Sequence, residues 1–536
     1  MTTVREATLD LFRAHGITTW FGNPGSSELS LLQDFPDDMR YFLGLQEMVP
    51  VGMADGYAQI SGRPVLVNLH TAPGSGNAQG ALYNAYMNKS PLIVTAGNQR
   101  RIMQNQNNLL TNIDPTTVPK PFVKWSAEPA IASETPAVLA HAIHLAQTPP
   151  TGPVYVSLPM DDMDVELTDE QVADTTVVAR RRVVHATGFP DALARELAAR
   201  INAAKNPALV VGMEVDQSNA WDSVIALAER INAVVWNAPL AGTPGFPSDH
   251  PQYRGPLLPG RAWVTERLEG HDLVVVIGSA VFRYYPYMPG PYLPKGTELI
   301  HFTNDPDEAA RAPIGDAYVT DATAAVAAIL AHVTVTDRPR PPARPQPPAV
   351  TLETAPMSPE ALWGTVGRVA PADALYVSEA GSNEAVLPQY LHSSAPLSHL
   401  FGRGDGLGWG LPAALGAQLA APDRPVIAAM GDGSMHYAIS ALSTAAQYRI
   451  PVTIVVASNA EYGILKLFAG YEKTAGVPGL DLPPLDIVSI ANGYGVDTHE
   501  AGSTDELADM LKVGITDRDR PTLINVRTTP VAQFGP

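Results

Sequence analysis

A glycine-rich turn between two apolar segments is the feature that most constrains the fold of this chain. Pro425 to Met430 and Pro451 to Ala457 are short, apolar and partly β-branched, which predicts two buried strands. Between them, Met435 to Tyr448 carries apolar residues at helical spacing. A strand, a crossover helix and a parallel strand almost always wind right-handed, so both strands end at the same edge of the sheet. The pattern therefore predicts a parallel α/β unit.

Two oxygen-bearing side chains follow these strands, Asp432 in the turn Gly431-Asp-Gly-Ser434 and Asn459 after the second strand. We expect them to face one crevice at the carboxyl ends of neighbouring strands. Oxygen ligands beside a glycine-rich helix N-terminus suit a hard cation that carries a diphosphate. A GDG turn alone is usually only a tight turn, and the matching Asn459 is what favours a binding site.

Length, charge and cysteine content limit the classes of function that this chain can have. At 536 residues the chain is too long for one hydrophobic core, and three domains are expected. The formal net charge of −19 argues against a nucleic-acid partner, because nothing offsets phosphate repulsion. The absence of cysteine excludes disulfides and thiolate metal ligands. No signal-peptide pattern or membrane-length apolar run is present, so we expect a cytoplasmic protein without a membrane partner.

Proline-rich and polar segments indicate where the domains of the chain begin and end. Residues 337–350 contain six prolines and read as an extended linker, and the polar stretch from Val165 to Pro190 is a softer boundary. We expect an N-terminal domain over 1–180, a central domain over 190–336 and a C-terminal domain over 351–536. Each piece alternates apolar strands with helical stretches, which predicts an α/β fold of three open parallel sheets.

Three polar features of the first domain also stand at predicted strand ends. Gly22 to Ser27 follows a strand ending at Phe21, Glu47 follows a strand ending near Leu45, and His70 follows Leu69. Ligands of open α/β sheets bind beyond the carboxyl ends of the strands. Each residue also has an ordinary interpretation: a serine as a helix N-cap, a glutamate as a solvated helix start, a histidine as a buried donor. Their convergence on one sheet edge favours a site.

Together these motifs resemble the thiamine diphosphate-dependent 2-keto acid decarboxylases, and most closely the branch that acts on benzoylformate. The resemblance includes Gly22-Asn-Pro-Gly-Ser26, His70-Thr-Ala-Pro-Gly-Ser-Gly76 and the GDG…Asn pair, and extends over essentially the whole chain. It implies a pyrimidine-binding, a central and a diphosphate-binding domain. It also implies thiamine diphosphate with Mg²⁺, or Ca²⁺ in its place, as cofactors. In the family the cofactor lies between two subunits, so a homodimer is the minimum active unit and a homotetramer is expected.

The resemblance assigns roles to residues of the C-terminal domain. Asp432, Asn459 and the backbone carbonyl of Glu461 would hold the metal. The residues expected to line the diphosphate are Gly381, Ser382, Gly433, Ser434 and Tyr462. The segment Gly404 to Gly408, with Asp405 and Leu407, would cradle the aminopyrimidine ring.

The catalytic groups implied by the resemblance come mostly from the first domain. Glu47 would hydrogen-bond the pyrimidine nitrogen, so that general acid–base catalysis is relayed through the cofactor. His70 and Ser26 would handle the substrate carboxylate and proton transfers. The activity implied is decarboxylation of an aromatic, benzoylformate-like 2-keto acid to an aldehyde and carbon dioxide. The substrate wall implied is Leu109, Leu110, Phe401, Ile464, Leu465 and Phe468.

Four positions depart from the family pattern: Tyr285, Arg403, Asp405 and Ile464, the last of which is bulkier than its counterpart and suggests a tighter pocket. Tyr285 stands where the benzoylformate-specific branch has a catalytic histidine, and a phenol is a poorer proton shuttle than an imidazole at neutral pH. We therefore expect slower protonation before aldehyde release, and with it acyloin carboligation. Arg403 and Asp405 replace small residues; they either pair with each other or a neighbour, or face the substrate.

Other enzyme classes remain as alternatives. A thiamine-dependent carboligase or aldehyde lyase, or an acetolactate synthase-like enzyme, would share the cofactor site. A nicotinamide dehydrogenase is disfavoured because no glycine-rich loop has the G-x-G-x-x-G fingerprint with an acidic residue about 20 positions on. A scaffold without activity is disfavoured by the intact Glu47 and GDG…Asn motif.

Overall fold

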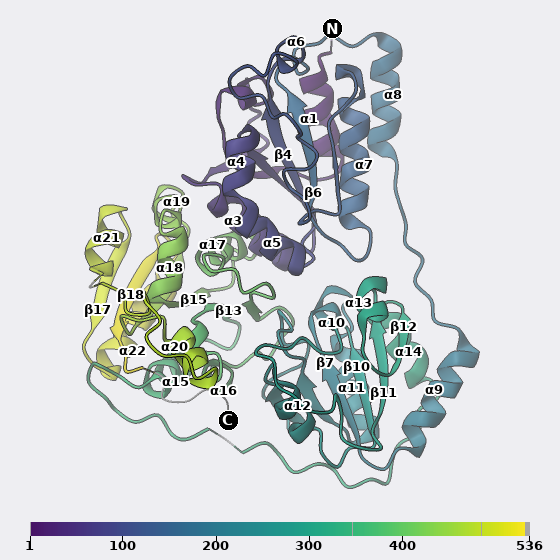
Figure 1. The fold of residues 1–536 in the computed structure, drawn as a ribbon, viewed down its shortest axis with the longest axis vertical. Helices are drawn as coiled ribbons and strands as arrows, with labels where there is room; N and C mark the ends of the chain where they lie inside the picture. Colours follow the sequence, from purple (N-terminus) through teal and green to yellow (C-terminus); the bar gives the residue numbers. More distant parts are fainter. Residues whose placement is uncertain (1, 346, 484, 531–536) are drawn as a thin grey trace.

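The computed structural model describes residues 2–345, 347–483 and 485–530 (Figure 1). In this part of the chain each of three domains is built around a parallel sheet of six strands with helices on its faces. No helix among the described residues is long and apolar enough to cross a membrane.

The N-terminal domain has the strand order β2-β1-β3-β4-β6-β5. Its strands are β1 Thr19–Asn23, β2 Arg40–Leu43, β3 Val65–Leu69, β4 Leu92–Asn98, β5 Trp125–Ala127 and β6 Val154–Pro159. Its helices are α1 Val4–Ala14, η1 Ser26–Glu28, α2 Leu29–Leu32, α3 Met48–Ser61, α4 Thr71–Asn77, α5 Gln79–Met87, α6 Arg101–Gln104, η2 Ala132–Glu134, α7 Thr135–Gln147 and α8 Asp169–Arg180.

The middle domain has the strand order β12-β11-β10-β7-β8-β9. Its strands are β7 Pro207–Val211, β8 Val234–Asn237, β9 Tyr253–Pro256, β10 Leu273–Ile277, β11 Glu298–Thr303 and β12 Asp316–Val319. Its helices are α9 Asp191–Ala203, α10 Met213–Gln217, α11 Trp221–Ile231, α12 Arg261–Arg267, α13 Pro306–Arg311 and α14 Ala322–Leu330.

The C-terminal domain has the strand order β14-β13-β15-β16-β18-β17. Its strands are β13 Leu375–Glu379, β14 His399–Phe401, β15 Val426–Gly431, β16 Val452–Ser458, β17 Asp497–Ala501 and β18 Thr522–Arg527. Its helices are α15 Pro359–Val369, η3 Gly381–Asn383, α16 Leu387–Tyr390, α17 Gly410–Ala420, α18 Asp432–Met435, η4 His436–Ala438, α19 Ala441–Gln447, α20 Gly463–Tyr471, α21 Ile487–Gly493 and α22 Thr504–Thr516.

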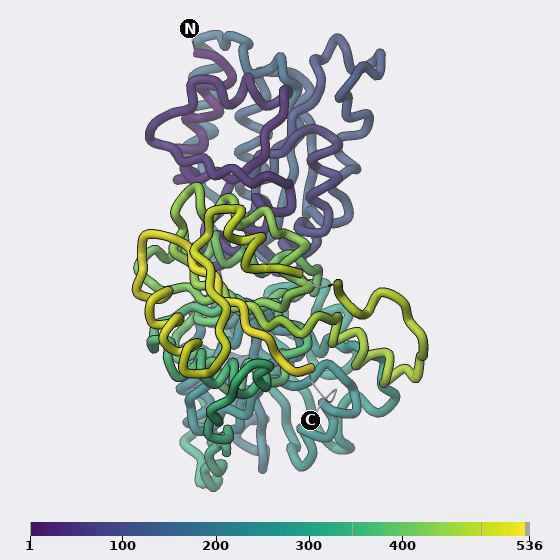
Figure 2. The backbone as a smooth tube through the Cα atoms, turned by 90° about the vertical axis from the view of Figure 1, so that its left-hand side faces the viewer, coloured from purple at the N-terminus to yellow at the C-terminus, as the bar shows by residue number. Residues whose placement is uncertain are grey.

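The N-terminal and C-terminal domains pack directly on each other, as the purple and the green-to-yellow parts of Figure 2 show. One hydrophobic core runs through both domains, whereas the middle domain has a core of its own. Helices α3 and α17 cross at the centre of the contact. A Cβ atom at Gly56 would collide with the backbone of Ala413, and one at Gly416 with the backbone of Met53. These two glycines therefore allow the helices to approach closely.

The predicted strand ends are confirmed within two residues, and the predicted α/β class is confirmed. The helix expected over Met435 to Tyr448 is wrong as a single element: it is divided into the end of α18, the 3₁₀ turn η4 and α19. A 3₁₀ turn has a period close to that of an α-helix, so apolar spacing cannot reveal the interruption. The described residues of 337–350 contain no helix or strand, as expected for a proline-rich linker.

Candidate active site

Asp432 and Asn459 meet at the edge where β15 and β16 end. The two strands are parallel neighbours, with Gly431 beside Ala457. The Asp432 carboxylate accepts hydrogen bonds from the backbone N–H groups of Gly433 and Ala460, both at 2.8 Å. The Asn459 amide oxygen accepts one from the backbone N–H of Glu461 at 3.1 Å. The two residues therefore follow neighbouring strands at one edge of the sheet, as expected.

Small residues keep the space beside this edge open. A Cβ atom on Gly433 would lie 2.7 Å from Tyr462 Cε1, and one on Gly463 would lie 2.7 Å from Ser382 Oγ. Ser434 is fixed by donating a hydrogen bond of 2.6 Å to the backbone carbonyl of Glu379. The edge thus offers hydroxyl groups, backbone N–H groups and glycine-lined space, a donor set that fits a metal-bound diphosphate.

A cavity of about 340 Å³ opens next to this edge, between the C-terminal and the middle domain. It brings together nine of the residues singled out from the sequence: Gly381, Ser382, Asp405, Leu407, Tyr462, Ile464, Leu465, Phe468 and Tyr285. Tyr285 packs edge-on against Phe468, with ring centroids 4.8 Å apart. We call this space the reaction cavity.

Some expected residues do not line the reaction cavity. Phe401 lines a second, smaller cavity beside it. Leu109 and Leu110 lie on the loop after α6 in the N-terminal domain, where the Leu109 side chain is 83% exposed. Ser26, Glu47 and His70 also belong to the N-terminal domain and are absent from the described wall of the cavity. The sequence-predicted site therefore falls into two groups in one chain.

The N-terminal group is organised around two carboxylates. Glu47 stands at the N-terminus of α3, where its carboxylate accepts hydrogen bonds from Asn23 at 3.1 Å and Asn77 at 2.9 Å. His70 stands at the N-terminus of α4, and its Nδ1 lies 3.0 Å from the Glu28 carboxylate and 3.1 Å from Ser27 Oγ. The Glu28 carboxylate raises the pKa of His70, because it stabilises the imidazolium form.

Glu28 is a functional candidate that the sequence pattern does not single out, because it has the form of an ordinary helix start. Its side chain is buried and its carboxylate accepts hydrogen bonds from the backbone N–H groups of Gly25 at 2.7 Å and Gly97 at 2.8 Å. An acidic residue near a helix N-terminus is ordinary in sequence, so no local signal distinguishes it. Of the two serines that precede Glu28, Ser27 contacts His70, whereas Ser26 is exposed.

Arg403 pairs with a neighbour rather than with Asp405. Its guanidinium lies 2.9 Å from Glu308 of the middle domain, and Glu308 lies 3.4 Å from Lys89 of the N-terminal domain. Lys89 in turn is 2.8 Å from Glu214. This buried ionic cluster joins all three domains and removes Arg403 from the wall of the reaction cavity.

The segment that follows Arg403 is held from several sides. The Asn84 side chain donates to the Gly406 carbonyl at 2.8 Å and accepts from the Gly406 N–H at 3.1 Å. Trp409 donates from its backbone N–H to Glu379 at 3.0 Å and from its indole to the buried Asp55 at 2.7 Å. The same chain's N-terminal domain therefore fixes the backbone that carries Asp405 and Leu407.

Three family models match the chain. The thiamine pyrophosphate enzyme N-terminal TPP binding domain matches residues 2–118, the central domain matches 194–329, and the C-terminal TPP binding domain matches 379–526. The benzoylformate decarboxylase of Pseudomonas aeruginosa is 46% identical over 531 residues, which cover 99% of this chain and 100% of that protein.

A solved structure also matches the chain over nearly its whole length. The thiamine diphosphate-dependent 4-hydroxybenzoylformate decarboxylase of Rhodococcus jostii superposes with a TM-score of 0.95 at 45% identity, covering 98% of this chain and 99% of that one. By contrast, the acetolactate synthase isozyme 3 large subunit of Escherichia coli is 27% identical over 504 residues, which cover 90% of this chain and 86% of that protein. The chain belongs to the thiamine diphosphate-dependent enzymes, in the 2-keto acid decarboxylase family that includes the benzoylformate decarboxylases.

Proposed function

We propose that this protein decarboxylates an aromatic 2-keto acid of the benzoylformate type to an aldehyde and carbon dioxide. The observation that carries the proposal is the wall of the reaction cavity, which combines apolar side chains with the glycine- and serine-rich edge of the C-terminal sheet. Such a wall suits an aromatic group held next to a diphosphate-anchored cofactor. The likeness to two decarboxylases of aromatic 2-keto acids over nearly the whole chain supports it.

Thiamine diphosphate supplies the electron sink that accepts the electron pair released when carbon dioxide leaves. Asp432, Asn459 and the Glu461 carbonyl would hold Mg²⁺, with Ca²⁺ as a substitute. Carboxylate, amide and carbonyl oxygens are the ligands that both ions prefer. Gly381, Ser382, Gly433, Ser434 and Tyr462 would line the diphosphate, and Asp405 and Leu407 belong to the segment that would hold the pyrimidine ring.

We assign the proton transfers to the N-terminal group of residues. Glu47, oriented by Asn23 and Asn77, is the proposed acid–base group toward the pyrimidine ring. His70, whose pKa the Glu28 carboxylate raises, is the proposed partner of the substrate carboxylate, and Ser26 is proposed to assist in proton transfer. Because these residues are absent from the described wall of the reaction cavity in their own chain, we propose that a second subunit supplies them. The minimum active unit is then a homodimer, which two such dimers extend to a homotetramer.

Tyr285 favours a secondary activity. It lines the reaction cavity at the position where the resemblance implies a catalytic histidine, and a phenol transfers protons poorly near neutral pH. Slow protonation leaves time for carbon–carbon bond formation with a second aldehyde. We therefore propose acyloin carboligation as a side reaction of the same site.

A panel of 2-keto acids tests the main proposal. The purified protein is assayed for carbon dioxide release from benzoylformate, 4-hydroxybenzoylformate, pyruvate and a branched aliphatic 2-keto acid. Each assay is run with thiamine diphosphate and Mg²⁺, and again without each of them. We expect release from the aromatic substrates only when both cofactors are present. Release from pyruvate alone, or none from any aromatic substrate, would contradict the proposal.

A further inference from the structure

One largely buried carboxylate of the middle domain is surrounded by cations from all three domains. The Glu308 side chain, on α13, lies 2.9 Å from the guanidinium of Arg403, whose side chain is only 1% exposed. Its other cationic neighbours are Arg283 and Lys89, each at 3.4 Å. Burial opposes ionisation of Glu308, but the three cations outweigh it and lower the pKa of Glu308 to about 2. Glu308 is therefore a carboxylate at neutral pH.

The cluster around Glu308 lies where a sheet of this topology usually binds a ligand. The strand order of the middle sheet places β10 next to β7, and the following strands extend outward from this pair on opposite sides. Open α/β sheets bind ligands in the crevice at the carboxyl ends of such a pair. Here Lys89 lies 2.8 Å from Glu214, which follows β7, and 3.1 Å from Asp305, which follows β11. Side chains of the other two domains therefore enter the middle domain at its usual ligand position.

The backbone of Arg403 is anchored as well as its side chain. Its N–H donates to Asn88 of the N-terminal domain at 3.1 Å, and its carbonyl accepts from the Arg283 guanidinium at 3.3 Å. The Arg403 guanidinium also donates to the backbone carbonyl of Met87 at 3.2 Å. A Cβ atom on Gly242 of the middle domain would lie 2.8 Å from Arg403 Cγ, so a glycine at this position leaves room for the arginine. The surrounding domains are therefore shaped to receive Arg403.

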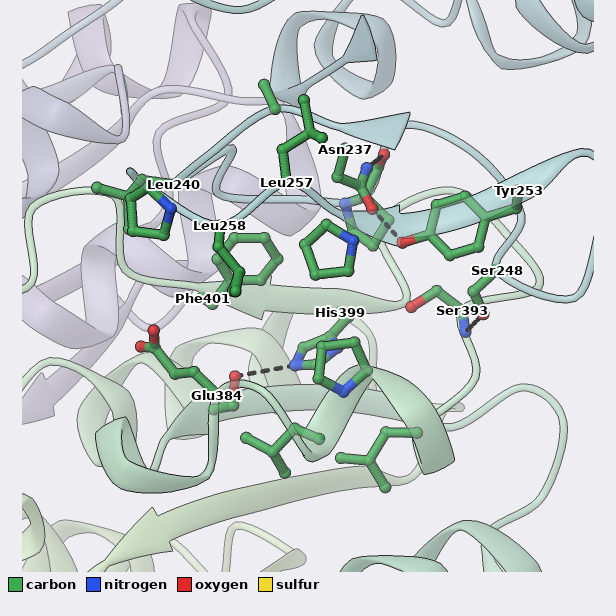
Figure 3. Close-up of a pocket in the computed structure, with 18 of the residues that line it drawn as sticks. Asn237, Leu240, Ser248, Tyr253, Leu257, Leu258, Glu384, Ser393, His399 and Phe401 are labelled. Atoms are coloured by element: carbon green, nitrogen blue, oxygen red, sulfur yellow. Dashed lines mark hydrogen bonds between the residues drawn. The ribbon is translucent and has the colours of Figure 1, made fainter. Parts of the chain in front are cut away.

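Arg403 stands between two stretches of chain that line cavities. Figure 3 shows Phe401, two residues before it, together with Leu258 of the middle domain on the wall of the second, smaller cavity. Asp405 and Leu407, which follow Arg403, line the reaction cavity. A displacement of Arg403 would therefore change the wall of the reaction cavity, although Arg403 itself does not line it.

We propose that Glu308 is a positioning residue of the reaction cavity, which acts through Arg403 on the segment Gly404 to Gly408. This inference rests on the proposed function, because that function assigns the segment to the pyrimidine ring of thiamine diphosphate. The ion pair holds one end of the segment against the middle domain, and the hydrogen bonds of Trp409 hold the other end. Without the Glu308 charge, Arg403 and Arg283 would be neighbouring cations that lack their shared counter-ion, and their repulsion would displace the segment.

The test measures the dissociation constant of thiamine diphosphate, in the presence of Mg²⁺ and without substrate, by quenching of tryptophan fluorescence. In Glu308→Gln we expect this constant to rise about 10-fold, because no ion pair holds the segment in place. Arg403→Met fills similar space without the charge and should raise the constant by a similar factor. Because both substitutions remove the same ion pair, their effects should not add, and the double variant should stay within about 3-fold of Arg403→Met.

The free energy of unfolding in urea separates positioning from a general structural role. Glu308→Gln leaves a buried cation unpaired and should destabilise the fold, whereas the double variant removes both partners and should recover much of the lost stability. The dissociation constant of thiamine diphosphate should nevertheless stay raised in the double variant. A merely structural role would instead return both quantities toward wild type together. Arg403→Met and the double variant decide the question even where Glu308→Gln does not fold.

Asp305→Asn is the matched control. Asp305 belongs to the same cluster and lies 3.1 Å from Lys89, but among the described residues it contacts neither Arg403 nor Arg283. Asparagine is as good an N-cap of α13 as the aspartate that it replaces. The dissociation constant of thiamine diphosphate in Asp305→Asn should therefore stay within about 2-fold of wild type.

Four results would overturn the inference. They are an unchanged dissociation constant in Arg403→Met, an equal rise in Asp305→Asn, additive effects in the double variant, and a double variant whose constant returns to that of wild type. Failure of the proposed function is distinguishable, because the constant is measured without substrate. A wild type that binds thiamine diphosphate but releases no carbon dioxide from any aromatic 2-keto acid would contradict the proposed function and leave the comparison of the variants intact.

Discussion

The strands of the N-terminal and C-terminal sheets are arranged in the same order across the sheet, yet the loops at their ends carry different kinds of side chain. Numbered within each domain, both sheets read 2-1-3-4-6-5, whereas the middle sheet reads 6-5-4-1-2-3. The N-terminal loops present Glu28, Glu47 and His70; the C-terminal loops present glycines, serines, Asp432 and Asn459. Under the proposed roles, one scaffold would support proton transfer in one copy and anchoring of a cofactor in the other.

The difference teaches that the site is the sum of two unlike halves. The acids and histidine of the first half are held by hydrogen bonds inside their own domain. The second half is an open edge with small side chains next to a cavity. Under this assignment, damage to the first half should reduce the rate of chemistry, and damage to the second should reduce cofactor retention.

The largest effect is expected at Glu47. Glu47→Gln keeps hydrogen bonds to Asn23 and Asn77 within reach but removes the ionisable group, so kcat should fall by about 10² to 10⁴-fold. Thiamine diphosphate affinity, measured by fluorescence quenching, should remain within about 10-fold of wild type. Retained turnover would contradict the role given to the first half.

Asp432→Asn probes the second half. Losing the carboxylate removes a charged metal ligand, so the concentrations of Mg²⁺ and thiamine diphosphate needed for half-maximal activity should rise about 10 to 100-fold. At saturating cofactor the activity of Asp432→Asn should partly return, whereas the activity of Glu47→Gln should stay low. Cofactor titrations of the rate check this, and unchanged half-saturation together with a reduced kcat would reverse the assignment of the two halves.

Glu28→Gln should change the pH dependence. Glu28 raises the pKa of His70, so the imidazolium persists to higher pH in wild type than an ordinary histidine would. Without the carboxylate, the fall of kcat/KM on the alkaline side of the His70 titration should move to lower pH. Ser27→Ala, which removes a contact with His70 but no charge, is the matched control and should move this limb less. An identical pH profile in Glu28→Gln would show that His70 acts without Glu28.

The smallest effect is expected at Tyr285, which belongs to neither half but to the middle domain. Tyr285→His should increase the ratio of aldehyde to acyloin product by about 3 to 10-fold, since an imidazole delivers protons faster. The products formed from benzoylformate with added aldehyde are quantified by chromatography. A product ratio equal to that of wild type would remove Tyr285 from proton delivery.

Local sequence patterns were sufficient for the strands and for residues directly after them. Phe21, Leu69, Asp432 and Asn459 were placed correctly because apolar runs and turn residues are local signals. The break inside Met435 to Tyr448 was not predicted, since its apolar spacing suits both helix types. The domain limits at 180, 190, 337 and 350 stay predictions.

Other features depend on contacts between distant segments. The partner of Arg403 could not be chosen from sequence, because Glu308 is remote in the chain and belongs to another domain. The burial of Glu28 depends on the N–H of Gly97, which only the pairing of strands brings near. The shared strand order of the first and third sheets is likewise a property of strand pairing.

The most direct test of the account mixes two variants, assayed at a cofactor concentration that saturates the wild type but at which each variant alone is inactive. Glu47→Gln and Asp432→Asn are co-expressed with different tags and the purified assemblies are assayed for carbon dioxide release from benzoylformate. If each site combines the N-terminal half of one subunit with the C-terminal half of another, mixed dimers contain one intact site, and a random mixture should recover about a quarter of wild-type activity. Activity no higher than that of either variant alone would show that both halves of a site come from one chain.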